Sequence, residues 1–244
     1  MIKFSALCPT RKRPDNMARL AHSFFKRSKN PDENEIVFYI DDDDTESIKK
    51  AQELQSLYNV QYIVGERIVL SQMWNKCYDI CKGEYVFHCG DDIIMLTPDW
   101  DTIVENKFLE FDDRIAFVFG DDLNPAFANH DFGTHGFLHR NWISAVGYFV
   151  PPYFSSDYND TWLNEVSKAI GRHCFVNIVT EHLHPGVGKS EWDLTHRERL
   201  ARHRSDNVEM IYRSKEPERR EDCLKLSRFI DQFSERDSII KHEN

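Results

Sequence analysis

Short runs of β-branched and aromatic residues end at groups of aspartates at three places along the chain. The runs cover residues 35–40, 85–88 and 115–119, and the acids that follow are Asp41 to Asp44, Asp91-Asp92 and Asp121-Asp122. Continuous apolar runs of this length are typical of strands covered on both faces, as in parallel sheets. Ligands of open α/β sheets bind beyond the carboxyl ends of the strands, so this pattern predicts an acidic site at one sheet edge.

Segments with helical spacing separate the expected strands. Apolar residues recur every three to four positions in 45–58, 71–81, 100–110 and 157–170, and Asp15 can cap a helix that runs to Phe25. Further strands are expected at residues 2–7, 60–64 and 174–180. The alternation predicts an α/β, Rossmann-like fold in which helices flank a mostly parallel central sheet.

The size of the chain favours one core. With 244 residues, of which 41% are hydrophobic, we expect a single domain over residues 1–210 and a polar, peripheral helical extension over residues 211–244. The sequence contains no apolar run of about 18 residues and no signal-peptide layout, which predicts a soluble, cytoplasmic protein without a transmembrane segment. The net charge of −10 argues against a surface that follows a nucleic-acid backbone throughout, although residues 195–204 are strongly basic.

Asp91 and Asp92 are the strongest candidates for chemistry. They lie between a strand of the buried type and the segment Thr97 to Trp100, which restarts the chain as a turn and a helix. A hard divalent cation held by one or two carboxylates can neutralise a phosphate-bearing leaving group. A solvated acidic loop is the simpler interpretation of an isolated Asp-Asp pair, but the framing by a strand and a helix favours a cation site.

Five segments together resemble the family 2 glycosyltransferases, which have the GT-A fold. The segments are PTRKRP, FYIDDDDT, WNKCYDICKGEYVFHCGDD, LTPDW and DTWL, within about the first 190 residues. The resemblance implies that a nucleotide sugar is bound by Thr10, Arg11, Arg13, Asp41, Asp43, Asn75, Lys76, Gly90 and Asp91. Lys189, in the flexible sequence GVGK, could close over the diphosphate or lie in a plain surface loop.

One position departs from the family pattern. The family's metal motif is Asp-x-Asp, and aligning its second aspartate with Asp91 puts Cys89 where the first is expected. Many relatives have Gly-Asp-Asp here, so the resemblance still implies a metal ion at Asp91 and Asp92. A catalytically degenerate nucleotide-sugar-binding module is the alternative.

The resemblance also implies a catalytic base and a late histidine ligand. The base is an aspartate at the start of a helix, which Asp160 matches best and Asp157 second, although a helix N-cap has the same signature. His182 and His184 share one face of the last strand if it continues, and either could bind the metal or be a hydrogen-bonded structural histidine.

The implied activity is metal-dependent transfer of a sugar, hexose-like, from a nucleoside-diphosphate donor to a hydroxyl acceptor with inversion. The expected donor is a UDP-sugar and the expected ion is Mn²⁺ or Mg²⁺. The acceptor stays open: a glycan, a small molecule, a protein or a modified base in viral DNA. Residues 132–137 could stack on an acceptor sugar or belong to the core, and residues 195–204 could contact phosphate or form a solvated helix face.

Overall fold

The computed structural model describes the backbone of residues 1–242 and the side chains of residues 1–235. Within this range, eight strands form one sheet in the order β3-β2-β1-β4-β7-β6-β8-β5. The strands are β1 (Phe4–Thr10), β2 (Asn34–Asp41), β3 (Val60–Gly65), β4 (Tyr85–His88), β5 (Ile93–Met95), β6 (Phe117–Asp121), β7 (Gly136–His139) and β8 (His173–His182). The helices are α1 (Pro14–Arg27), α2 (Thr45–Gln55), α3 (Leu70–Ile80), α4 (Trp100–Leu109), α5 (Arg140–Val146), α6 (Asn159–Ala169), α7 (Leu194–Ser205), α8 (Val208–Ser214) and α9 (Glu216–His242).

The sheet is mixed, which corrects the expectation of a mostly parallel one. Strands β3, β2, β1 and β4 are mutually parallel. Strand β7 is antiparallel to both β4 and β6, and β5 is antiparallel to β8. No crossover helix lies between β6 and β7, and consecutive strands joined in that way pair antiparallel.

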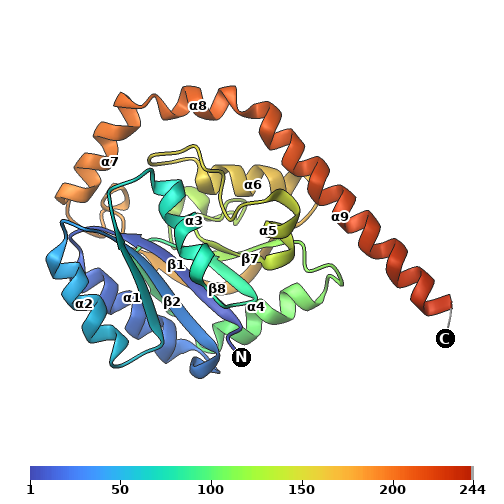
Figure 1. The fold of residues 1–244 in the computed structure, drawn as a ribbon, viewed down its shortest axis with the longest axis horizontal. Coiled ribbons are helices and arrows are strands. Elements are labelled where there is room, and N and C mark those ends of the chain that lie inside the picture. The colour runs from blue at the N-terminus through green and yellow to red at the C-terminus, as the bar shows by residue number, and fades with distance from the viewer. Residues whose placement is uncertain (243–244) are drawn as a thin grey trace.

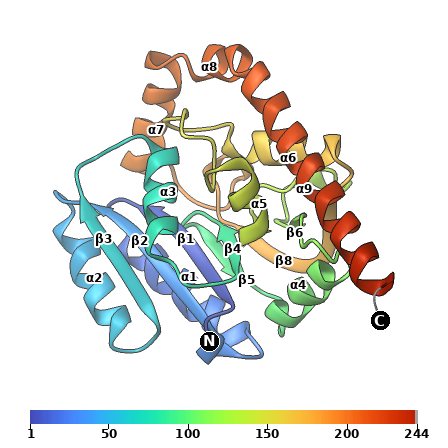
Figure 2. The ribbon, with the colours of Figure 1, turned by 45° about the vertical axis from the view of Figure 1, so that its right-hand side comes forward.

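Helices cover both faces of the sheet, as Figures 1 and 2 show. Alternate residues of the central strands enter two separate hydrophobic clusters: Phe38 packs on the side of α1, α2 and α4, and Val37 on the side of α3, α5 and α6. Strands covered on both faces are mainly apolar, which is why β2 and β4 contain continuous apolar runs, and the buried Glu35 of β2 accepts a hydrogen bond from Ser5 of β1 at 2.6 Å.

Helix α1 begins at Pro14, one residue before the expected cap. Proline suits the first helical position because its fixed φ is helical and it lacks the N–H that would be unpaired there. Arg13 is the N-cap residue, so Asp15 lies within the first turn instead of capping it. This start leaves the Arg13 side chain free to reach the edge of the sheet.

The C-terminal helices α7, α8 and α9 form an arc around one side of the molecule (Figure 1). The first half of α9 packs against α5 and α6, and its Leu226 is fully buried. This half of the expected extension is therefore packed against the body of the molecule, and residues 243–244 lie outside the described part of the chain. None of the described helices combines the length and the apolar character that crossing a membrane requires.

Candidate active site

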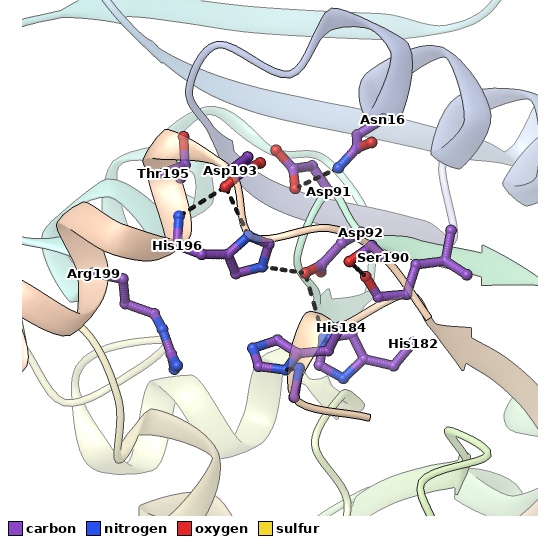
Figure 3. A network of polar contacts seen from close by, with 12 residues as sticks. Asn16, Asp91, Asp92, His182, His184, Ser190, Asp193, Thr195, His196 and Arg199 are labelled. Atoms are coloured by element: carbon purple, nitrogen blue, oxygen red, sulfur yellow. Dashed lines mark hydrogen bonds and ion pairs between the residues drawn. The ribbon is translucent and has the colours of Figure 1, made fainter. Parts of the chain in front are cut away.

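Asp91 lies at the edge of the sheet, where the ends of β1 and β4 meet. The Thr10 hydroxyl donates to Asp91 Oδ2 at 2.7 Å, and Arg13 Nη1 donates to Oδ1 at 3.0 Å. Asn16 adds a longer contact of 3.4 Å (Figure 3). Burial raises the pKa of Asp91, and the positive charge of Arg13 opposes that rise. The parallel register of β1 and β4 thus brings Asp91 next to the Thr-Arg segment that follows β1.

Asp92 faces His182. Strands β5 and β8 pair Ile93 with His182, and this register places the imidazole Nε2 3.5 Å from Asp92 Oδ2. The other ring nitrogen, Nδ1, lies 3.8 Å from Asp122 Oδ2. Burial lowers the pKa of His182, but Asp122 and Asp92 outweigh burial and raise it to about 9. The two carboxylates therefore favour a positive charge at this position, and a metal ion would bind Nε2 in place of its proton.

His135 completes this cluster and was not among the residues selected from the sequence. Its ring is buried, and neither ring nitrogen has a hydrogen-bond partner among the described residues. Ligand atoms of Asp92, His135 and His182 all lie within 4.8 Å of one another. Burial lowers the pKa of His135 to about 3, so the ring is neutral at physiological pH, the form that binds metal ions. The only sequence signal was a histidine in the Gly-rich segment 132–137.

Two glycines direct the chain that carries His135. A Cβ at Gly133 would lie 2.6 Å from the Phe119 ring, and one at Gly136 would lie 2.3 Å from the Phe117 ring. The backbone therefore passes directly over the aromatic side chains of β6, which only glycine allows at such separations. The His135 side chain, between these two glycines, points into the site.

Cys89 lies in the hydrophobic core. It is fully buried, belongs to the cluster on the α1 side of the sheet, and its Sγ lies 3.5 Å from the carbonyl oxygen of Leu7. Gly90 follows, where a Cβ would lie 2.7 Å from Asp92 Oδ1. The side chains that reach the site are thus those of Asp91 and Asp92, and position 89 supplies packing.

A cavity of about 240 Å³ lies above these acids. Arg11 and Asp41 line the cavity and form an ion pair, with Arg11 Nη1 2.7 Å from Asp41 Oδ2. Arg11 also pairs with Asp43, which is not in the lining. Helix α7 covers the cavity with His196, Arg199 and Arg202. His196 Nε2 lies 3.8 Å from Asp92, and its Nδ1 lies 2.7 Å from Asp193 (Figure 3).

A second cavity, of about 370 Å³, meets the first. Both are lined by Asp160 and His182. Burial raises the pKa of Asp160 to about 6, and the nearby Asp157 charge adds to the rise. Asp157 instead forms ion pairs with Arg199 and His203 of α7.

Most of the residues selected from the sequence line the first cavity: Thr10, Arg11, Arg13, Asp41, Gly90, Asp91, Asp92, Asp157, Asp160, His182 and His184. Asp43, Asn75, Lys76 and Lys189 are not in that lining. The Asn75 amide bonds the backbone of Phe149 and Val150, the Lys76 side chain is exposed beside Asp79, and Lys189 lies 3.4 Å from Glu181. The His184 ring lies next to that of His182, and its Nδ1 accepts the Gly186 N–H.

Solved structures share this architecture. The chain matches residues 1–349 of S. aureus TarS with a TM-score of 0.57 and 12% identity, covering 74% of this chain and 60% of that one. It matches the mannosyltransferase PcManGT from Pyrobaculum calidifontis, in complex with GDP-Man and Mn²⁺, with a TM-score of 0.63 and 14% identity, covering 85% of this chain and 64% of that one.

The chain has the GT-A fold. A further match with the GT-A fold is TarS in complex with UDP-GlcNAc, at a TM-score of 0.57 and 12% identity, covering 79% of this chain and 62% of that one. The chain thus spans a little under two thirds of the length of these structures. No protein-family model matches the sequence, and no curated protein sequence matches it significantly.

Proposed function

We propose that this chain is a metal-dependent glycosyltransferase that moves a sugar from a nucleoside diphosphate to a hydroxyl acceptor with inversion. The observation that carries the proposal is the meeting of two cavities at Asp160 and His182. An inverting transfer needs a base beside the acceptor hydroxyl, which attacks the sugar carbon from the side opposite the leaving diphosphate. The complexes of similar structures with UDP-GlcNAc and with GDP-Man and Mn²⁺ support a nucleotide sugar as the donor, and a UDP-sugar remains our first candidate.

The residues of the first cavity suit the donor. Asp41 Oδ1 is buried and has no hydrogen-bond partner among the described residues, so it can accept a hydrogen bond from an N–H group of the donor's nucleobase. Arg202 Nε is buried without a hydrogen-bond partner among the described residues, and Arg11 Nε has only an ion pair with Glu198 at 3.5 Å, so both can donate to the nucleotide. Thr10 and Arg13 fix Asp91 beside the donor. A family 2 assignment and a cytoplasmic location remain predictions.

The residues around Asp92 fit a divalent cation. The unpaired nitrogens of buried His135 and the carboxylate of Asp92 are suitable ligand atoms, and His182 lies beside them. A Mn²⁺ or Mg²⁺ ion there would neutralise the charge that develops on the leaving diphosphate. Asp92 and His182 are the ligands we favour from the sequence candidates, and ligand roles for Asp91 and His184 remain predictions.

Asp160 suits the role of the base. Unlike Asp91, Asp92 and Asp157, it forms no ion pair with a described residue, and Thr161 is its hydrogen-bond partner. A carboxylate whose pKa is about 6 is ionised at neutral pH and takes a proton more readily than an ordinary aspartate. It would accept the proton of the acceptor hydroxyl as that oxygen attacks the sugar carbon.

The second cavity suits an acceptor with a flat, apolar face. Phe127 and Phe132 stack with ring centroids 4.6 Å apart, and both line it together with Tyr158. Aromatic faces of this kind pack against sugar rings and other flat rings. Glycans, small molecules and modified bases offer such rings, and a protein acceptor is less well matched.

The proposed base is tested by Asp160→Asn. We expect the variant to bind UDP with Mn²⁺ as the original chain does, because Asn keeps the shape of the side chain. Sugar transfer and donor hydrolysis should fall about 10²- to 10⁴-fold, the usual contribution of a general base. Calorimetric titration measures the first quantity, and release of UDP from a panel of UDP- and GDP-sugars measures the second.

Asp112→Asn is the control, since it removes an exposed carboxylate that lines neither cavity. Equal loss of turnover in both variants would contradict the assignment of Asp160. If the unchanged chain binds UDP with Mn²⁺ but hydrolyses no donor, the chain is a nucleotide-sugar-binding module. The core position of Cys89 removes the main sequence argument for that alternative.

A further inference from the structure

His135 supplies a third protein side chain to the cation position. We propose that Asp92, His135 and His182 form a site that binds a first-row transition-metal ion before any nucleotide is present, and that this site discriminates against Mg²⁺. The inference rests on the cation role of Asp92 and His182 in the proposed function. It adds a ligand, the class of metal and the order of binding.

The position of His135 is built into the fold. The side chain is 7% exposed, and both ring nitrogens lack a partner among the described residues. Buried polar groups are nearly always hydrogen-bonded, because leaving one unpaired is unfavourable, so this ring is explained best by a ligand. Asn164 of α6 holds the segment before His135 through two hydrogen bonds to Gly133. The Gly133 N–H donates to Asn164 Oδ1, and Asn164 Nδ2 donates to the Gly133 carbonyl, each at 2.8 Å.

The geometry lies close to that of a coordinated ion. The three ligand atoms lie within 4.8 Å of one another. Metal–ligand bonds of about 2.0 to 2.2 Å place neighbouring ligand atoms roughly 3 to 3.5 Å apart. Side-chain rotations that move these atoms by about 1 Å would therefore bring all three within bonding distance of one ion. Asp122 lies behind His182, with its Oδ2 3.8 Å from Nδ1, and can orient the ring as carboxylates do behind metal-binding histidines.

The ligand set determines the class of metal. Imidazole nitrogens suit Zn²⁺, Fe²⁺, Co²⁺ and, less strongly, Mn²⁺, whereas Mg²⁺ prefers oxygen ligands and retains its waters. Two imidazoles and one carboxylate therefore favour a transition-metal ion. Three protein ligands also allow binding without the phosphate oxygens that a site with fewer protein ligands would need.

The test uses the full chain without nucleotide. Mn²⁺ is titrated and the free ion is followed by electron paramagnetic resonance, and Co²⁺ is added separately to record its visible absorption spectrum. We expect one Mn²⁺ ion to bind per chain and an equimolar amount of Mg²⁺ not to displace it. The Co²⁺ absorption spectrum should be typical of nitrogen ligands. His135→Gln should raise the Mn²⁺ dissociation constant at least about 10-fold, since even the loss of a group behind a ligand has that effect.

His22→Gln is the control. His22 is an exposed imidazole on α1 that contacts the Tyr58 hydroxyl, so its loss should leave Mn²⁺ binding unchanged. Circular dichroism melting checks that His135→Gln is folded, and the Mg²⁺ competition on the unchanged chain does not depend on any variant.

Three results would overturn the inference: Mn²⁺ binding only when UDP or GDP is present, displacement of Mn²⁺ by equimolar Mg²⁺, or unchanged Mn²⁺ affinity in His135→Gln. Metal-dependent donor hydrolysis that persists alongside any of them would leave the proposed function standing. Conversely, tight Mn²⁺ binding to the nucleotide-free chain without turnover of any donor would support the inference and contradict the proposed function.

Discussion

At the scale of single residues, charge neutralisation distinguishes the acids of the site. Asp91 is paired with Arg13, and Asp92 faces His182 and His196, which hold its pKa well below the ordinary value despite burial. Asp160 is partly buried without such a cation, and loss of hydration raises its pKa to about 6. Neighbouring carboxylates whose environments separate their pKa values in this way are typical of divided chemical roles.

The pH dependence of transfer follows from Asp160. Its base form is lost as the pH falls through about 6, so turnover at saturating donor should decline below that pH and level off above it. Rates measured across the pH range with a Mn²⁺-loaded chain check this. A profile that declines only below about pH 4, the ordinary aspartate range, would argue against Asp160 as the base.

The same shift has a consequence for stability. Because the pKa of Asp160 is higher in the folded chain than in the unfolded chain, its negative charge lowers the free energy of unfolding above about pH 6. The effect disappears at a pH low enough to protonate Asp160 in both states. Asp160→Asn should therefore melt at a higher temperature than the unchanged chain at pH 8, and the two should melt alike near pH 3.

At the scale of elements, helix α7 is held mainly by charged side chains. His196 is its only buried residue among those described. Its ion pairs join Asp193 to Arg13 at 2.7 Å, Glu198 to Arg67 at 2.6 Å, and Arg199 and His203 to Asp157. The helix lines the cavity of about 240 Å³ with His196, Arg199 and Arg202.

Hydrogen exchange can measure this attachment. Raising the salt concentration from about 0.1 M to about 1 M shortens the Debye length from about 10 Å to about 3 Å, so α7 amides should exchange faster while α3 amides change little. Asp157→Asn should speed α7 exchange at low salt, and Asp112→Asn, at an exposed site, should not. Protection of α7 should increase with UDP and Mn²⁺. Salt-independent exchange of α7 would show that packing, not charge, holds it.

The sequence predicted the elements whose burial is uniform. Strands β2 and β4 were located within about a residue because both faces are covered, and the acids after them therefore fell in the site. Strands β5 and β7 were missed, because β5 has only three residues and pairs with β8, far along the chain, whereas β7 follows directly on a Gly- and His-rich segment that resembles a loop. His135 was missed for the same reason: the position of β7, which no local pattern encodes, brings it to Asp92.

At the scale of the whole molecule, the C-terminal helices are joined to the body by a buried polar contact. Asp222 of α9 accepts hydrogen bonds from the Tyr148 hydroxyl and, at 3.0 Å, from Trp162 Nε1. The Arg219 guanidinium lies over the Trp162 ring and pairs with Glu165 at 2.7 Å. A boundary at residue 210 therefore separates segments that are packed together.

Asp222→Ala tests how far α9 contributes to the fold. Two buried donors would lose their acceptor, so the free energy of unfolding should fall by about 2 to 3 kcal/mol, measured by urea titration. Asp231→Ala, at an exposed position of the same helix, should change it by less than about 0.5 kcal/mol. Equal stability of the two variants would support an independent extension beyond residue 210.

Strand β7 joins the two halves of the site. On one side lie β1, β2 and β4, which carry the residues proposed to hold the nucleotide, and on the other lie β6 and β8, whose flanking loops line the second cavity. Between them, β7 meets β6 through a single residue pair, Val118 with Phe137. Substitutions in the loops that flank β6 and β8 are therefore expected to reshape the second cavity while leaving β1, β2 and β4 in place.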